Sequence, residues 1–185
     1  LRFRPVHSSV SGTVTRVDNV VLSGNQPVMC VEIKPDGLQE VFEEIKPPAV
    51  DSRESFLSAI RASGLTGLGG AGFPAHVKLN PPKGTKVDTL IINGAECEPY
   101  ITSDYRECIE NTDGIVEGIL HVLKWTGIEK AMIGIEDNKP EAIKALSQAV
   151  SDIPSITVHS LPARYPQGAE KTLIYALTGR EGSSG

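Results

Sequence analysis

Short apolar runs alternate with amphipathic stretches over most of the chain, from about residue 49 onward. Three of these runs have the length and composition of buried parallel strands, and they are residues 89–92, 131–135 and 156–161. Apolar residues at helical spacing lie between and after them, over residues 113–126, 140–150 and 168–177. This alternation predicts an α/β fold with a doubly wound, Rossmann-like parallel sheet and right-handed crossovers.

Capping residues and prolines predict where the helices begin and end. The expected boundary residues are Asp51 with Glu54, in the pattern of a capping box, and Gly64 for one helix, Asp113 and Gly127 for a second, and Asn138 with Pro140 for a third. The first of these helices lies just after the proline pair at residues 47–48, where the pattern of the chain changes.

The first 48 residues follow a β pattern instead. Short strands are expected over residues 12–17, 20–22 and 28–33, separated by Asn, Gly and Pro turn signals. The sequence therefore predicts a small β segment at 1–48, an α/β domain at 49–181 and a flexible Gly-Ser tail at 182–185.

A glycine cluster follows the first predicted helix, with five glycines between residues 64 and 72. Glycine is tolerated in such a cluster where the backbone takes positive φ or closely approaches a ligand. Successive backbone N–H groups in such a loop favour an anion, and the phosphate of a nucleotide or flavin is the natural guest. A plain linker is the alternative, because the pattern Gly67-x-Gly69-x-x-Gly72 follows a helix rather than the strand that a dinucleotide fingerprint requires.

Two further segments follow predicted strands. An apolar strand ends in the polar, acidic loop that begins with the run Asn93-Gly94-Ala95-Glu96-Cys97-Glu98-Pro99 and extends to Arg106. The run Tyr165-Pro166-Gln167-Gly168-Ala169-Glu170-Lys171 leads from a strand into a helix. Ligands of open α/β sheets bind beyond the carboxyl ends of the strands, so both segments are expected at the ligand-binding edge.

Together with Gly67–Pro74, these segments resemble RnfC (also called RsxC), the peripheral NADH- and flavin-binding subunit of the Rnf ion-translocating electron transport complex. They are more distantly similar to the NADH-binding flavoprotein subunit of respiratory complex I. The resemblance covers nearly the whole chain. It implies electron transfer between NAD(H) and FMN within a membrane-bound ferredoxin:NAD oxidoreductase complex, and it makes residues 1–48 part of a lipoyl-like β-barrel segment.

The resemblance also implies which residues bind the cofactors, while no residue is needed as a catalytic acid, base or nucleophile because the flavin supplies the chemistry. The implied cofactor-binding residues are Gly67, Gly69, Gly70 and Gly72 in the loop, Phe73 for stacking, Lys78 as a cation, Asn93, Glu96 and Glu98 after the first strand, and Tyr165, Gly168 and Glu170 beside the nucleotide. Simpler interpretations stay open for some: Lys78 as a solvated charge, Glu98 as a cap for Tyr100 and its neighbours, and Glu170 as an acid in the first turn of a helix.

Composition bears on partners and compartment. A net charge of -5 without a basic stripe disfavours nucleic acid. No run of about 18 apolar residues is present, so membrane association is expected through the other Rnf subunits, at the cytoplasmic face of the bacterial inner membrane. Cys30, Cys97 and Cys108 are single and widely spaced, which excludes the close spacings of zinc and iron–sulfur sites. The family's 4Fe-4S clusters lie further towards the C-terminus.

Two departures from the family limit the inference. Ala169 stands where the complex I relatives carry an acid, and the family continues past residues 178–181 into a loop that helps to hold the flavin phosphate. We therefore expect an incomplete pocket, with no cofactor necessarily bound, and an isolated chain without activity. The alternative function is a docking or scaffold module with an empty or quinone-reductase-like pocket.

Overall fold

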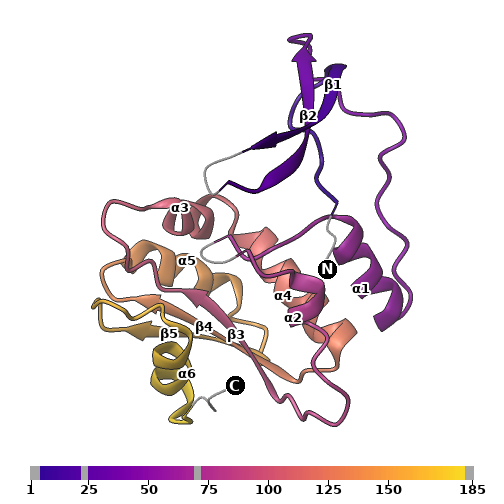
Figure 1. Ribbon diagram of the computed structural model, residues 1–185. Helices are drawn as coiled ribbons and strands as arrows, with labels where there is room; N and C mark the ends of the chain where they lie inside the picture. Colours follow the sequence, from indigo (N-terminus) through magenta and orange to yellow (C-terminus); the bar gives the residue numbers. More distant parts are fainter. Residues whose placement is uncertain (1–4, 22–24, 69–71, 182–185) are drawn as a thin grey trace. The chain divides into compact units, whose positions relative to one another are not determined.

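The chain divides into two compact units, Leu1–Asn80 and Pro81–Gly185 (Figure 1). The structure is a computed structural model that describes residues 5–21, 25–68 and 72–181. The division after Asn80 falls inside the segment that the sequence analysis treats as one α/β domain, so the bounds at 48 and 181 stay predictions. The predicted tail at 182–185 lies outside the described residues.

An antiparallel strand pair begins the first unit, β1 (Gly12–Val21) with β2 (Pro27–Pro35). The predicted interruption between residues 17 and 20 is wrong, because Asp18 and Asn19 stay in the ladder opposite Cys30 and Met29. The ladder is irregular nearer its start, where the register shifts between residues 14 and 16. Most of the valines on both strands are exposed, so the pair has no core of its own.

Two helices follow in the first unit, α1 (Arg53–Ala62) and the single turn α2 (Ala75–Lys78). The predicted capping box of Asp51 and Glu54 is wrong by one residue. Ser52 is the N-cap, its hydroxyl accepts from the Ser55 N–H, and the Ser55 hydroxyl accepts from the Ser52 N–H. The two serine hydroxyls supply the two acceptors that a reciprocal cap needs, and the donors are backbone N–H groups. The predicted end is confirmed, with Gly64 at a φ of +72° just after the helix.

A parallel sheet of strand order β3-β4-β5 forms the centre of the second unit (Figure 1). Its strands are β3 (Thr89–Gly94), β4 (Lys130–Glu136) and β5 (Ile156–Leu161). Its helices are α3 (Ser103–Glu110), α4 (Thr112–Thr126), α5 (Pro140–Ala149) and α6 (Glu170–Thr178). The parallel α/β fold and its three strands are confirmed, whereas α3 occupies a segment that the sequence analysis leaves as a polar loop.

Helix boundaries in this unit agree with the sequence in most places. Gly127 ends α4 in the left-handed conformation, and Pro140 lies in the first turn of α5 as predicted. The predicted cap Asp113 is wrong, because the N-cap is Asn111, two residues earlier, and the helix begins at Thr112. Asp113 lies in the first turn of α4, where the helix dipole stabilises its negative charge. None of the helices in the described residues is long and apolar enough to cross a membrane.

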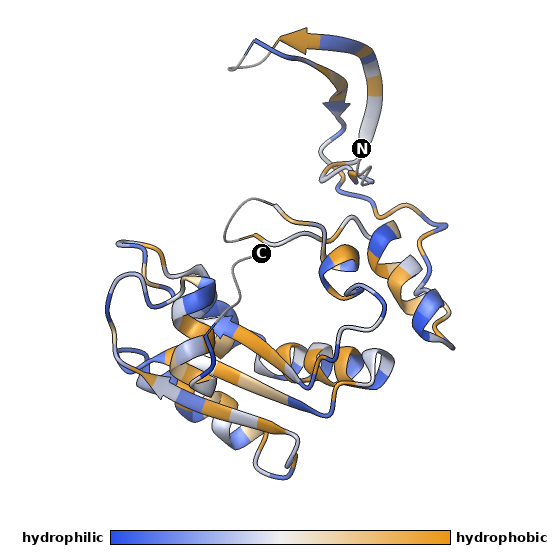
Figure 2. Cartoon of the chain, turned by 60° about the horizontal axis from the view of Figure 1, so that its bottom comes forward, coloured by the Kyte–Doolittle hydropathy of each residue, from blue (hydrophilic) through white to orange (hydrophobic). Residues whose placement is uncertain are grey.

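Successive side chains of the central strand β4 point alternately to the two faces of the sheet. Ala131, Ile133 and Ile135 pack into the core with side chains from α3, α4 and α5, and each of the three is at most 1% exposed. Gly134 faces the other way, where an added Cβ would lie 2.9 Å from Leu173 of α6. Helices therefore cover both faces of the sheet. Figure 2 shows that much of the length of the strands between these helices is hydrophobic.

Replacing Leu146 by alanine is expected to destabilise the second unit by about 2–5 kcal/mol, because this α5 side chain is completely buried. The matched control is Leu120→Ala on α4, where the side chain is 39% exposed and the expected cost is below about 1 kcal/mol. Urea unfolding followed by circular dichroism measures both. Equal losses in the two variants would contradict the position assigned to the core.

Asp88, just before β3, is expected to titrate well below an ordinary aspartate. Arg180, after α6, donates to its carboxylate at 3.1 Å and 3.0 Å, and this pairing lowers the pKa of Asp88 to about 2. Because the folded-state pKa lies below the unfolded value of about 3.9, the stabilisation is present above about pH 4 and is lost as the pH falls through about 2. NMR titration should show Arg180→Met raising this pKa and Arg106→Met leaving it unchanged.

Candidate functional site

The loops that follow the three parallel strands meet at one edge of the sheet. They enclose a pocket of about 350 Å³ in the second unit. Its lining residues come from the loop after β3 (Glu96, Cys97, Glu98, Pro99, Tyr100, Ile101), the end of β4 and the loop after it (Glu136, Asn138, Lys139), and the loop after β5 (Ala163, Arg164, Tyr165). The prediction that the segments after the first and third strands lie at the same edge of the sheet is confirmed.

Asn93 joins the loops after β3 and β5 directly. Its side-chain amide donates to the Gly168 carbonyl oxygen at 2.9 Å, and its oxygen accepts from the Ala95 N–H at 3.2 Å. An added Cβ at Gly168 would lie 2.7 Å from the Ala95 oxygen, so only glycine lets the two backbones approach this closely. Two of the predicted site residues are therefore brought together by a contact within the protein.

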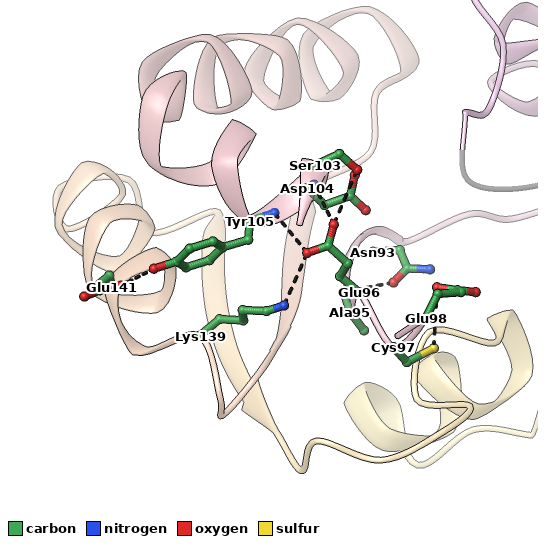
Figure 3. Close-up of polar contacts among 10 residues, drawn as sticks. All are labelled: Asn93, Ala95, Glu96, Cys97, Glu98, Ser103, Asp104, Tyr105, Lys139 and Glu141. Atoms are coloured by element: carbon green, nitrogen blue, oxygen red, sulfur yellow. Dashed lines mark hydrogen bonds and ion pairs between the residues drawn. The ribbon is translucent and has the colours of Figure 1, made fainter. Parts of the chain in front are cut away.

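The Glu96 carboxylate is turned into the protein at the start of α3 (Figure 3). Its side chain is 2% exposed. One oxygen accepts from the Asp104 N–H at 2.8 Å and from the Ser103 hydroxyl at 3.4 Å, and the other accepts from the Tyr105 N–H at 3.4 Å. The carboxylate therefore does for α3 what an N-cap side chain usually does.

Lys139 is a residue of the pocket that the sequence analysis misses. Its ammonium lies 3.2 Å from the second Glu96 oxygen and 5.5 Å from the centre of the Tyr105 ring (Figure 3). The only signal in the sequence is its position in the polar run 136–139, immediately beyond the apolar strand β4. Because Lys139 immediately precedes α5, the ion pair ties the loop after β3 to the loop after β4.

Acidic side chains give the pocket a distinct electrostatic character. Glu136, at the end of β4, is 2% exposed, and burial raises the pKa of its carboxyl group while Lys139 lowers it. Burial also raises the pKa of Asp104, and the charges of Glu96 and Glu98 add to that rise. Carboxylates thus crowd this edge of the sheet, and Lys139 partly offsets their charge.

The other predicted residues of the second unit lie nearer the solvent. Glu98 and the 75% exposed Tyr165 line the pocket, and the Cys97 sulfur lies 3.9 Å from a Glu98 carboxylate oxygen. Glu170 begins α6, is exposed and is not among the lining residues, which agrees with its simpler interpretation as an acid in a first helical turn. Arg106 forms an exposed ion pair with Glu110, one turn further along α3.

The glycine loop belongs to the first unit, and its Gly69 and Gly70 lie outside the described residues. At its base the Gly67 N–H donates to the Phe73 carbonyl oxygen at 3.0 Å, and Gly72 has a φ of +62°. A Cβ added at Gly67 would meet only that Phe73 oxygen, at 3.9 Å, among the described residues. Among the described residues, a Cβ at Gly67 would therefore make only an ordinary van der Waals contact. Lys78, at the end of α2, is exposed.

Gln167 tests whether the second unit suits a flavin. Its side chain is completely buried, and its oxygen accepts from the Arg164 Nε at 3.0 Å, while its Nε2 has no hydrogen-bond partner among the described residues. A buried donor without an acceptor costs about 1–3 kcal/mol. The isoalloxazine ring has carbonyl oxygens and ring nitrogens that accept hydrogen bonds, so this donor suits the ring, although Gln167 is not among the residues that line the pocket. No group of three metal-ligating side chains occurs within the ranges that the structure describes.

Comparisons with known proteins agree with this arrangement. Residues 60–185 match the family model of the Nuo51 FMN-binding domain. The C subunit of the proton-translocating ferredoxin:NAD(+) oxidoreductase complex of Clostridium ljungdahlii is 46% identical over 97% of this chain and 40% of its own length. The C subunit of the Na(+)-translocating complex of Acetobacterium woodii is 44% identical over 98% of this chain and 42% of its own length.

A solved structure supports the fold alone. A chain of an NAD+-reducing [NiFe]-hydrogenase in the air-oxidized state superimposes with a TM-score of 0.57 and 24% identity, over 70% of this chain and 24% of its own. The chain described here spans about two fifths of the length of the two curated relatives named above. It belongs to the RnfC family, the C subunits of ion-translocating ferredoxin:NAD+ oxidoreductase complexes, and carries the Nuo51 FMN-binding domain of that family.

Proposed function

We propose that this chain holds FMN and NAD(H) in position for electron transfer between them, as part of the C subunit of a ferredoxin:NAD+ oxidoreductase complex. The observation that carries the proposal is the meeting of three strand-end loops around one pocket, in a chain whose relatives are named for this reaction. The flavin, when bound, supplies the chemistry by accepting a hydride and passing electrons on singly.

The residues divide between two tasks in this proposal. Backbone N–H groups of the glycine loop, with Lys78, bind the FMN phosphate, because such loops offer N–H groups and the lysine adds positive charge. In the second unit, the Gln167 amide has a donor without a partner among the described residues, which suits an acceptor of the flavin ring. Tyr165, Glu98 and Glu170 contact the nicotinamide nucleotide at the exposed side of the pocket. The chain binds and orients in each case, and no side chain transfers a proton.

Partners and location follow from the same assignment. The complex's other subunits hold this chain at the membrane, on the cytoplasmic face, where NAD(H) is found. We propose that 4Fe-4S clusters outside this chain receive or deliver the electrons; the chain matches 40% and 42% of the length of the two relatives.

One observation favours the second candidate, a docking module with an empty or quinone-reductase-like pocket. Asn93 and Glu96, both proposed from the sequence as flavin ligands, make hydrogen bonds inside the protein instead. Titration of the full-length subunit with FMN separates the candidates. Stoichiometric binding with quenched flavin fluorescence supports the electron-transfer function, and absence of binding supports the docking module.

Gly67→Val should weaken FMN binding by at least about 100-fold, which is about 2.7 kcal/mol, because its side chain would occupy the space where backbone and phosphate meet. The same change should leave the melting temperature of the FMN-free protein nearly unchanged, since among the described residues an added Cβ meets only the Phe73 oxygen, at 3.9 Å. Isothermal titration of the full-length subunit with FMN measures the loss.

Gly118→Ala is the matched control for this prediction. An added Cβ at Gly118 has no described atom within 4 Å and lies on the exposed face of α4. We expect unchanged FMN affinity and a gain of about 0.5–1 kcal/mol in stability, because alanine favours a helix over glycine. Full FMN affinity in Gly67→Val would exclude the glycine loop as the phosphate site.

A further inference from the structure

Four donors converge on the single carboxylate of Glu96. They are the Ser103 hydroxyl, the Asp104 and Tyr105 N–H groups, and the Lys139 ammonium, at distances from 2.8 to 3.4 Å. An ionised carboxylate has about four lone-pair sites. Glu96 therefore has no acceptor capacity left for a ligand, and a ligand that bonded it would displace a partner from a buried charge.

The same four contacts fix one wall of the pocket. Residues 97–101, which line it, run from Glu96 to the helix that Glu96 caps, so the carboxylate holds both ends of that loop. Lys139 fastens the loop to the start of α5, 43 positions away in the sequence. Side chains 2% and 14% exposed make this a largely buried ion pair, and removal of one partner would leave the other charge uncompensated.

We propose that Glu96 and Lys139 are a positioning pair that holds the wall of the nucleotide pocket in place, and that neither residue contacts FMN or NAD(H). This inference rests on the proposed function for the identity of the ligand. It reverses the role that the sequence suggests for Glu96, and it assigns a role to Lys139, which the sequence analysis does not single out.

The two roles of Glu96, as cap and as ion-pair partner, can be separated by substitution. Glu96→Gln keeps one oxygen that accepts from the α3 N–H groups but removes the charge that Lys139 pairs with. Lys139→Met leaves the buried carboxylate without its cation, whereas Lys139→Arg keeps a cation. The exchanged pair Glu96→Lys with Lys139→Glu keeps opposite charges, but lysine has no acceptor for the N–H groups of α3.

The test measures NADH oxidation by the FMN-loaded full-length subunit with a soluble one-electron acceptor. Lys139→Met should raise the KM for NADH at least about tenfold and change kcat less than about threefold, because the wall that receives the nucleotide is misplaced while the flavin is not. Lys139→Arg should have a KM within about threefold of that of the unsubstituted subunit, whereas the exchanged pair should not. Arg106→Met, which breaks the exposed ion pair on the same helix, is the matched control and should change neither constant.

Hydrogen exchange of the substrate-free protein gives a second, independent readout. The amide protons of Asp104 and Tyr105 should exchange at least about tenfold faster in Glu96→Gln and Lys139→Met, but not in Arg106→Met. Unchanged exchange together with unchanged KM overturns the proposal. Loss of FMN in Glu96→Gln but not in Lys139→Met also overturns it, because that result makes Glu96 a flavin ligand. Should the original subunit not oxidise NADH, the proposed function fails, and the exchange rates alone decide whether the pair positions the wall.

Discussion

The buried carboxylate of Glu96 is the constraint on which the geometry of the pocket depends. A charge that is 2% exposed must find several partners, and here it takes them from α3 and from the residue before α5. Because the two helices follow different strands, satisfying one carboxylate fixes the loops after β3 and β4 relative to each other. The polar loop that the sequence shows thereby becomes a short capped helix and a defined wall.

The third loop is held by backbone proximity instead of charge. Gly168 lies so close to the Ala95 oxygen that a side chain cannot fit, and Asn93 bridges the two segments with its amide. The pocket thus has two fixed joints, one between the loops after β3 and β4 and one between the loops after β3 and β5. The loop after β3 takes part in both, which explains why residues of the segment 93–99 are needed for the shape of the site even where they contact no ligand.

The sequence could predict the sheet, its strands and most of its helices, because apolar periodicity and residues such as Gly127 and Pro140 act locally. It could also predict that the loops converge, since parallel strands end at one edge. It could not predict α3, whose cap comes from Glu96, eight residues before Asp104, or the role of Lys139, 43 positions from its partner. The spacing of residues along the sequence does not predict contacts that form only when the chain folds. For the same reason the resemblance to RnfC selects Glu96 as a site residue without distinguishing a ligand from a residue that positions others.

Electrostatics separates the two proposed binding tasks. The carboxylates of Glu98 and Glu136 line a pocket in which the Lys139 ammonium is already paired with Glu96, so a phosphate placed beside these two carboxylates would be repelled by their charge, and Arg164 is the other cation in the lining. Backbone N–H groups of a glycine loop carry the opposite polarity and suit a phosphate. On the proposed function, the glycine loop binds phosphate, while the carboxylates of the pocket suit the hydroxyl and amide donors of a nucleotide. The ion pair between Lys139 and Glu96 therefore affects ligand choice as well as stability, because the paired Lys139 ammonium is not available to attract a phosphate.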